Sequence, residues 1–126
     1  MWDGFDKRKF PRLNLRCEII IQSESKNLLP VRTSTENVGA GGVAVILDHP
    51  LERFSRCRLR LELDPSLPQI EGTGRVVWTI PTGSPDFRKK LYDTGIEFVD
   101  LEGKDHELLH QFVQSRVQKG FREIVP

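Results

Sequence analysis

The sequence is poor in cysteine and contains no long apolar run. Its only two cysteines, Cys17 and Cys57, stand alone, without the paired spacing of a zinc knuckle or a redox motif. The longest apolar run, Val43 to Leu47, is too short to cross a bilayer, and the first ten residues lack the apolar core of a signal peptide. We therefore expect two buried thiols, no membrane insertion and a cytoplasmic protein.

An excess of charge of one sign is also missing. The formal net charge is +1, which gives no support to a nucleic-acid partner. With 37% hydrophobic and 29% charged residues the chain is typical of a soluble globular protein rather than a disordered one. Its 126 residues suit one domain, and no internal repeat is apparent.

The positive charges that are present gather near the amino terminus. Five basic residues without an intervening acid lie between positions 7 and 16, namely Lys7, Arg8, Lys9, Arg12 and Arg16. Pro11 fixes its own φ and favours an extended Phe10, so this stretch is not expected to be helical. We expect residues 1–14 to form a flexible basic arm that carries two guanidinium groups, Arg8 and Arg12. A solvated arm without a ligand is the alternative.

The centre of the chain is typical of β structure. Apolar and polar residues alternate in residues 15–22, 31–36 and 57–63, and further β-type runs cover 70–80 and 91–99. Turn-rich segments separate these runs. Short antiparallel strands at this spacing predict a small barrel or sandwich. Only residues 104–119 predict a helix, with Leu108, Leu109, Phe112 and Val113 on its packed face and Gly120 as its stop.

Two formal motif matches lack the context that their chemistry needs. Gly39 to Ala44 fits GxGxxA, but these glycines precede a β run, whereas a dinucleotide site needs a helix there. A tight turn between strands, with left-handed backbone conformations, suits them better. His106 to His110 fits HExxH, but no third zinc ligand follows at a suitable place.

No other arrangement of side chains indicates catalysis. We find neither a Ser, His and Asp set nor a coherent carboxylate pair, so we expect no enzyme activity, no catalytic residue, no metal and no cofactor. A hydrolase based on HExxH is a third alternative. Trp78, Phe87 and Tyr92 have rings that stack on bases in other proteins, although packing is the simpler role for each.

Four short motifs in order resemble the PilZ domain, a bacterial receptor module for cyclic di-GMP. Residues 8–12 match its RxxxR arm, and residues 37–42 align with its (D/N)xSxxG turn. Residues 74–78 are similar to its GxVxW strand, and residues 95–98 to its GIxF strand. The resemblance spans about residues 6–117. It implies a six-stranded antiparallel β-barrel with a carboxy-terminal α-helix, here residues 15–120, followed by a tail at 121–126.

The resemblance also implies a ligand site where the arm meets the glycine turn. Arg8 and Arg12 would clamp phosphate or the O6/N7 edge of guanine, since a guanidinium fork pairs with either. Asn37 would bind a guanine edge, while Gly39 and Gly42 lie in the turn that the ring approaches. We therefore expect a cyclic di-GMP receptor or adaptor that transmits the level of this second messenger to an unidentified protein of the motility, pilus, biofilm or regulatory machinery.

One position departs from the family pattern. Gly39 stands where the family has serine, so one hydroxyl contact is lost, worth about 0.5–1.5 kcal/mol. This loss alone would not abolish binding. The alternative is a degenerate PilZ-like module that docks proteins and binds no nucleotide.

Overall fold

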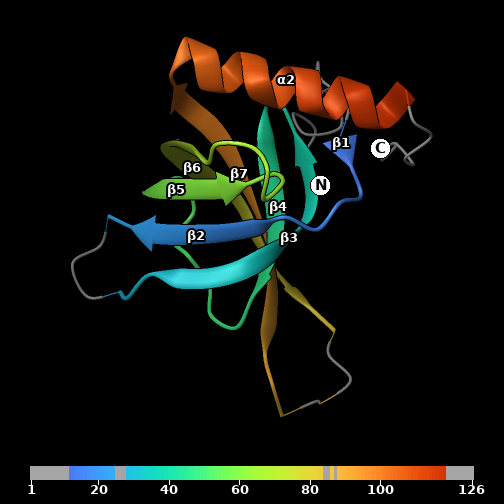
Figure 1. Cartoon of the computed structure of the whole chain (residues 1–126). Coiled ribbons are helices and arrows are strands. Elements are labelled where there is room, and N and C mark those ends of the chain that lie inside the picture. Colours follow the sequence, from blue (N-terminus) through green and yellow to red (C-terminus); the bar gives the residue numbers. More distant parts are fainter. Residues whose placement is uncertain (1–11, 25–27, 84–85, 87, 119–126) are drawn as a thin grey trace.

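The computed structural model describes residues 12–24, 28–83, 86 and 88–118. Within these residues the chain forms seven strands followed by a helix, shown in Figure 1. Their bounds are β1 (Arg12–Leu13), β2 (Glu18–Ser23), β3 (Val31–Gly39), β4 (Gly42–Leu47), β5 (Arg56–Glu62), β6 (Ile70–Thr82), β7 (Leu91–Leu101) and α2 (Gly103–Gln118).

Six of the strands close into a barrel. The antiparallel order is β3-β2-β5-β6-β7-β4, and β4 pairs back with β3, so the sheet has no open end. The short β1 pairs with the last residues of β3. The predicted six-stranded antiparallel barrel with a carboxy-terminal helix is therefore confirmed.

Strand alternation fills the barrel as the sequence predicts. In β5 the side chains of Cys57, Leu59 and Leu61 are buried, whereas Arg56 and Arg58 are exposed. Both cysteines are free thiols in the core, and burial raises the pKa of each to about 11. The expectation of two buried thiols is confirmed, because each sits at an inward position of an alternating segment.

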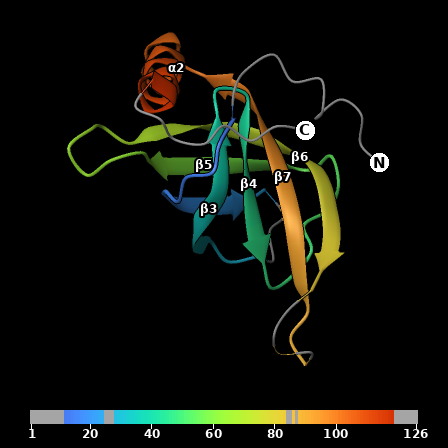
Figure 2. The same ribbon diagram turned by 90° about the vertical axis from the view of Figure 1, so that its right-hand side faces the viewer.

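Helix α2 closes one end of the barrel, as Figures 1 and 2 show from two sides. Its buried residues are Leu109, Phe112 and Val113, and Leu108 packs partly against the same core. The helix contacts β1, β3 and β6. The packed face is therefore the predicted one, while the proposed stop at Gly120 lies outside the described residues.

The first described residues belong to the barrel rather than to a free arm. The register places Arg12 opposite Gly39 and Leu13 opposite Val38, and Leu13 is fully buried. Burying a leucine side chain stabilises a fold by about 1.5–3 kcal/mol. The barrel therefore begins at Arg12, two residues before the expected end of the arm at residue 14.

A buried hydroxyl holds the link between β1 and β2. Thr35 Oγ1 accepts a hydrogen bond from the Cys17 amide at 2.8 Å and donates one to the Leu15 carbonyl at 2.8 Å. The Thr35 amide also donates to the Cys17 carbonyl at 2.9 Å. Thr35 is fully buried, so water does not replace these partners. The hydroxyl therefore fixes the path of the chain that leads out of β1.

Candidate functional site

The glycine-rich stretch forms a tight turn between two strands. Gly39 and Gly42 face each other as the last pair of the β3–β4 ladder, and Ala40 and Gly41 form the turn. No helix begins here, so the dinucleotide interpretation fails on its structural requirement. The predicted tight turn is confirmed.

Two bulges decide which side chains lie outside the barrel near this turn. The β3–β4 register shifts between Thr35 and Asn37, and the β6–β7 register shifts between Val76 and Trp78. Each bulge inserts one residue, which reverses the alternation beyond it. Thr35 and Val76 are fully buried, whereas Asn37 and Trp78 lie on the outer face.

The outer face between these bulges is a surface almost without side chains. One row of paired residues runs from Asn37 through Ala44 and Gly95 to Trp78. The next outer row runs from Arg12 through Gly39, Gly42 and Glu97 to Arg75. We call Gly39, Gly42, Ala44 and Gly95 the bare strip. It crosses β3, β4 and β7, which lie side by side in Figure 2.

Two glycines of the bare strip are required by close approach. A Cβ at Gly42 would collide with the backbone carbonyl of Ile96 on β7. A Cβ at Gly95 would overlap the ring of Trp78, which therefore lies directly on the glycine. The Trp78 Nε1 donates to Asp93 Oδ1 at 3.2 Å, and this bond fixes the ring at one side of the bare strip.

At the other side of the bare strip stands an unsatisfied acceptor. Asn37 Oδ1 is buried and has no hydrogen-bond partner among the residues that the structure describes. A buried polar atom without a partner costs about 1–3 kcal/mol, so such atoms in native proteins call for an explanation. A ligand that donates a hydrogen bond at the edge of the bare strip would supply the partner.

The second row ends in an ion pair. Arg75 Nε donates to Glu97 Oε1 at 3.0 Å, and Arg75 Nη2 contacts the same oxygen. The pair bridges β6 and β7, because Arg75 and Glu97 are direct partners in the register. Glu97 is also the direct partner of Gly42, so this residue lies beside the bare strip on β7, with its carboxylate held by Arg75 of β6.

The structure brings together those predicted site residues that it describes. Asn37, Gly39 and Gly42 lie within the β3–β4 hairpin, and the backbone of Arg12 pairs with Gly39. Arg8 lies outside the described residues, as does the predicted arm before β1.

Sequence patterns alone did not predict the placement of Trp78, Gly95 and Glu97 around the bare strip. The GxVxW and GIxF motifs marked the two strands, but strand pairing and two bulges were needed to bring them beside Asn37.

The HExxH residues do not gather into a metal site. His106 is exposed and His110 is half-buried on α2. Across the described parts of the chain, no group of three His, Cys, Asp or Glu side chains is arranged to hold a metal ion. Tyr92 is half-buried on β7, and Phe87 lies outside the described residues. Among the helices described, none has the length and apolar character needed to span a membrane.

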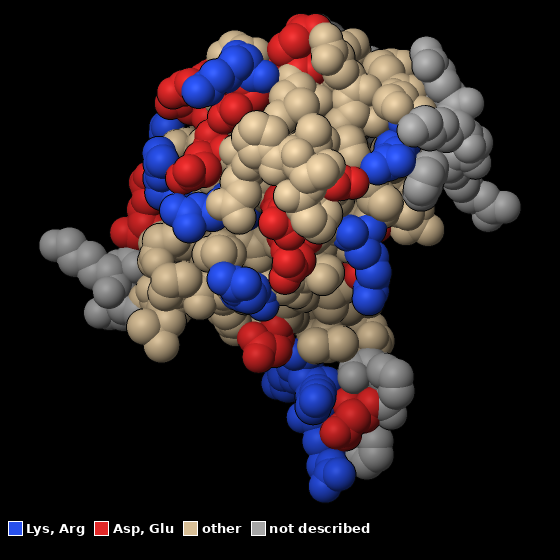
Figure 3. Space-filling model, viewed as in Figure 1, with Lys and Arg blue, Asp and Glu red and all other residues tan. Residues whose placement is uncertain are grey.

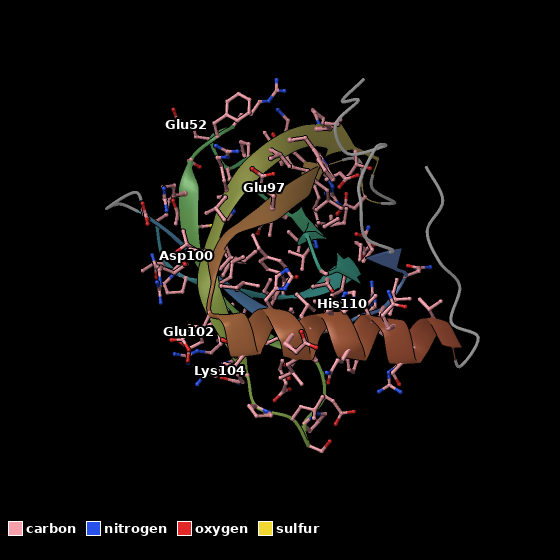
Figure 4. All side chains as sticks on the ribbon, turned by 90° about the horizontal axis from the view of Figure 1, so that it is seen from above. Glu52, Glu97, Asp100, Glu102, Lys104 and His110 are labelled. Carbon is pink, nitrogen blue, oxygen red and sulfur yellow. The ribbon has the colours of Figure 1, made fainter. Side chains whose placement is uncertain are left out.

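A separate hollow lies where β7 runs into α2. It has a volume of about 640 Å³ and is lined by side chains of both charges, among them Arg58, Asp100, Glu102, Lys104 and Asp105. Figure 4 shows Asp100, Glu102 and Lys104 together at this end of α2, apart from Glu97. Both charges also alternate over the face seen in Figure 3, so charge by itself selects no ligand on that face.

Comparison with protein families identifies the chain. The family model of the PilZ domain matches residues 6–115, which is most of the 126 residues. The chain belongs to the PilZ domain family. The match includes Arg8, Arg12, the β3–β4 hairpin and the first three turns of α2. A search among curated proteins gave no match to this PilZ domain.

Solved structures share the fold of this PilZ domain. Bacillus subtilis MotI/DgrA, described as an inhibitor of motility, is 24% identical with a TM-score of 0.73, covering 91% of this chain and 53% of its own. The Escherichia coli YcgR PilZ domain with c-di-GMP is 10% identical with a TM-score of 0.69, covering 90% and 93%. The MrkH-c-di-GMP complex of K. pneumoniae is 17% identical with a TM-score of 0.72, covering 89% and 53%.

These identities are low, so the likeness establishes the fold. The present chain spans about half the length of MotI/DgrA and of MrkH. The activities and partners of those longer proteins therefore do not transfer directly to this PilZ domain.

Proposed function

We propose that this PilZ domain is a non-enzymatic receptor for cyclic di-GMP. One observation carries the proposal: a buried, unpartnered acceptor, Asn37 Oδ1, stands at the edge of the bare strip, beside the strand that carries Arg12. The strand register supports the placement, because it sets the backbone of Arg12 opposite Gly39 and next to the buried Leu13.

The chemistry of the ligand matches the groups at this place. Cyclic di-GMP carries two phosphates and two guanines. The guanidinium groups of Arg8 and Arg12 pair with phosphate oxygens or with guanine O6 and N7. Asn37 Oδ1 accepts a hydrogen bond from a guanine N–H group. Gly39 and Gly42 carry no side chain, so a flat ring can approach their backbone closely once the site opens.

Two structural relatives support the assignment of the ligand. The YcgR PilZ domain and MrkH are both described in complex with c-di-GMP, and both share the fold of this chain. The family match runs continuously over residues 6–115, so it includes Arg8, Arg12, the β3–β4 turn and strands β6 and β7. The structural relatives and the local geometry therefore both support cyclic di-GMP as the ligand.

Binding would change the conformation of the domain. Asn37 Oδ1 and the bare strip are already buried, so a ligand reaches them only if nearby segments rearrange. We propose that binding orders the arm before β1 and thereby presents a new surface to a protein partner. A partner in motility, pilus, biofilm or regulatory machinery is consistent with MotI/DgrA being described as an inhibitor of motility.

Calorimetric titration with cyclic di-GMP tests the proposal. At about 100 μM ligand, a receptor of micromolar affinity, about −8 kcal/mol, is almost saturated and gives a clear heat signal. Amide exchange in the arm should slow in the same samples. Absence of both signals would reject the proposal.

The absence of the family serine at position 39 favours a second candidate function. Gly39 offers no hydroxyl to a ligand, which fits a degenerate module that docks a protein through the barrel or α2 without nucleotide. That candidate predicts partner binding that persists after Arg8 and Arg12 are both replaced by alanine. A receptor that responds through its arm predicts that the double variant no longer responds to cyclic di-GMP.

A further inference from the structure

The carboxylate of Glu97 is the only acidic group in the two outer rows that cross the bare strip. Glu97 pairs with Gly42 on one side and with Arg75 on the other. Adjacent strands lie about 4.8 Å apart, so Glu97 stands one strand from Gly42 and about two strands from Gly39. The side chain of Glu97 is 35% exposed. A ligand on the bare strip would therefore lie beside this carboxylate.

Arg75 orients Glu97 and leaves one oxygen available. Both contacts from Arg75 end on Oε1, through Nε and Nη2. Oε2 has no hydrogen-bond partner among the residues that the structure describes. The positive charge of Arg75 also offsets the negative charge of Glu97, which lowers its repulsion of ligand phosphates.

Guanine and adenine differ in what they present to such an oxygen. The Watson–Crick edge of guanine carries two neighbouring donors, N1–H and the N2 amino group, whereas adenine has an unprotonated N1 acceptor at the matching position. An ionised carboxylate only accepts hydrogen bonds. It therefore favours guanine and repels the adenine N1 lone pair, and such repulsion is an effective source of specificity.

We propose that Glu97 Oε2 accepts a hydrogen bond from the Watson–Crick edge of a bound guanine, and that Arg75 is the positioning residue for this contact. The proposal rests on the proposed function, because it concerns the selectivity of the same site. Asn37 and Glu97 then face the ligand from opposite sides of the bare strip, one from β3 and one from β7.

Replacement of Glu97 by glutamine tests the assignment. The amide oxygen of the variant turns toward Arg75, which needs an acceptor, so the amide NH2 faces the ligand where guanine also presents donors. Titrations with cyclic di-GMP and cyclic di-AMP measure the preference for guanine. We expect Glu97→Gln to weaken cyclic di-GMP binding about tenfold or more. Binding of cyclic di-AMP should not weaken, so the preference falls by at least that factor.

Glu71→Gln is a matched control. Glu71 also forms a cross-strand pair with an arginine on the outer face, with Arg60 at 3.5 Å, but it lies outside the two rows. This variant should leave both affinities unchanged. Thermal unfolding of both variants checks that each one folds.

The outcomes separate the two proposals. If the parent protein binds cyclic di-GMP and Glu97→Gln keeps the parent preference for guanine, the role of Glu97 is wrong while the receptor function stands. Equal binding of both dinucleotides by the parent protein would likewise reject the role of Glu97 alone. If the parent protein binds neither dinucleotide, both proposals fall.

Discussion

Arg12 lies directly opposite Gly39 in the antiparallel pairing of β1 with β3. The neighbouring pair, Leu13 and Val38, is completely buried, so the core sets the position of this arginine's backbone. A side chain that starts from a fixed backbone loses less conformational entropy when it binds than one on a free arm. This relationship fixes the backbone from which the proposed clamp at position 12 extends.

Replacement of either arginine by alanine should weaken cyclic di-GMP binding more than replacement of Lys9. A bidentate, charge-assisted pair is worth about 1.5–3 kcal/mol, so Arg8→Ala or Arg12→Ala should raise Kd roughly 10- to 150-fold. Lysine lacks the planar fork, and Arg12→Lys should recover little of the loss. Calorimetry compares the variants. Equal effects of Arg12→Ala and Lys9→Ala would contradict the clamp assignment.

Gly42→Ala should destabilise the fold. The added Cβ would collide with the Ile96 carbonyl, which belongs to the β7 backbone and cannot turn away as a side chain would. Overpacking of this kind costs about 1–3 kcal/mol. Urea denaturation measures the loss. Gly83→Ala is the control, because a Cβ there meets no atom within 4 Å, and it should change stability by less than about 0.5 kcal/mol.

Thr35→Val should loosen the link between β1 and β2. Valine has almost the same shape but cannot bond the Cys17 amide or the Leu15 carbonyl, so both lose a buried partner. The expected cost is about 1–3 kcal/mol in the free energy of unfolding. Thr35→Ser keeps the hydroxyl and loses one methyl group, about 0.8 kcal/mol. A serine variant no more stable than the valine variant would contradict the role of the hydroxyl.

Stability should fall as the pH rises from about 9 to 11. Burial raises the pKa of Cys17 and of Cys57 from 9.0 to about 11 in the folded chain. The unfolded chain ionises first, so the stabilisation is complete below pH 9 and is lost as the pH passes through the folded pKa. Urea unfolding at several pH values measures this slope. The double variant Cys17→Ala with Cys57→Ala should show a flatter profile, and an unchanged slope would refute the assignment.

Much of the fold follows from local sequence patterns. The alternation in residues 57–63 predicts β5, and the spacing of Leu109, Phe112 and Val113 predicts the buried face of α2. Both are consequences of side-chain period, which each segment carries by itself. The short β1 was not predicted as a strand, since two residues have no period and Leu13 is ordered only by the core that it enters.

The sequence by itself determined which strands carry the motifs, but the tertiary structure decided which residues share a surface. Uninterrupted alternation from Thr35 would direct Asn37 into the barrel, and alternation from Val76 would do the same for Trp78. A bulge before each residue turns it outward, and the strand register then aligns both in one row across Ala44 and Gly95. Bulges and register depend on the closure of the whole barrel, because each residue's face is set by pairing with distant strands rather than by its neighbours in the chain.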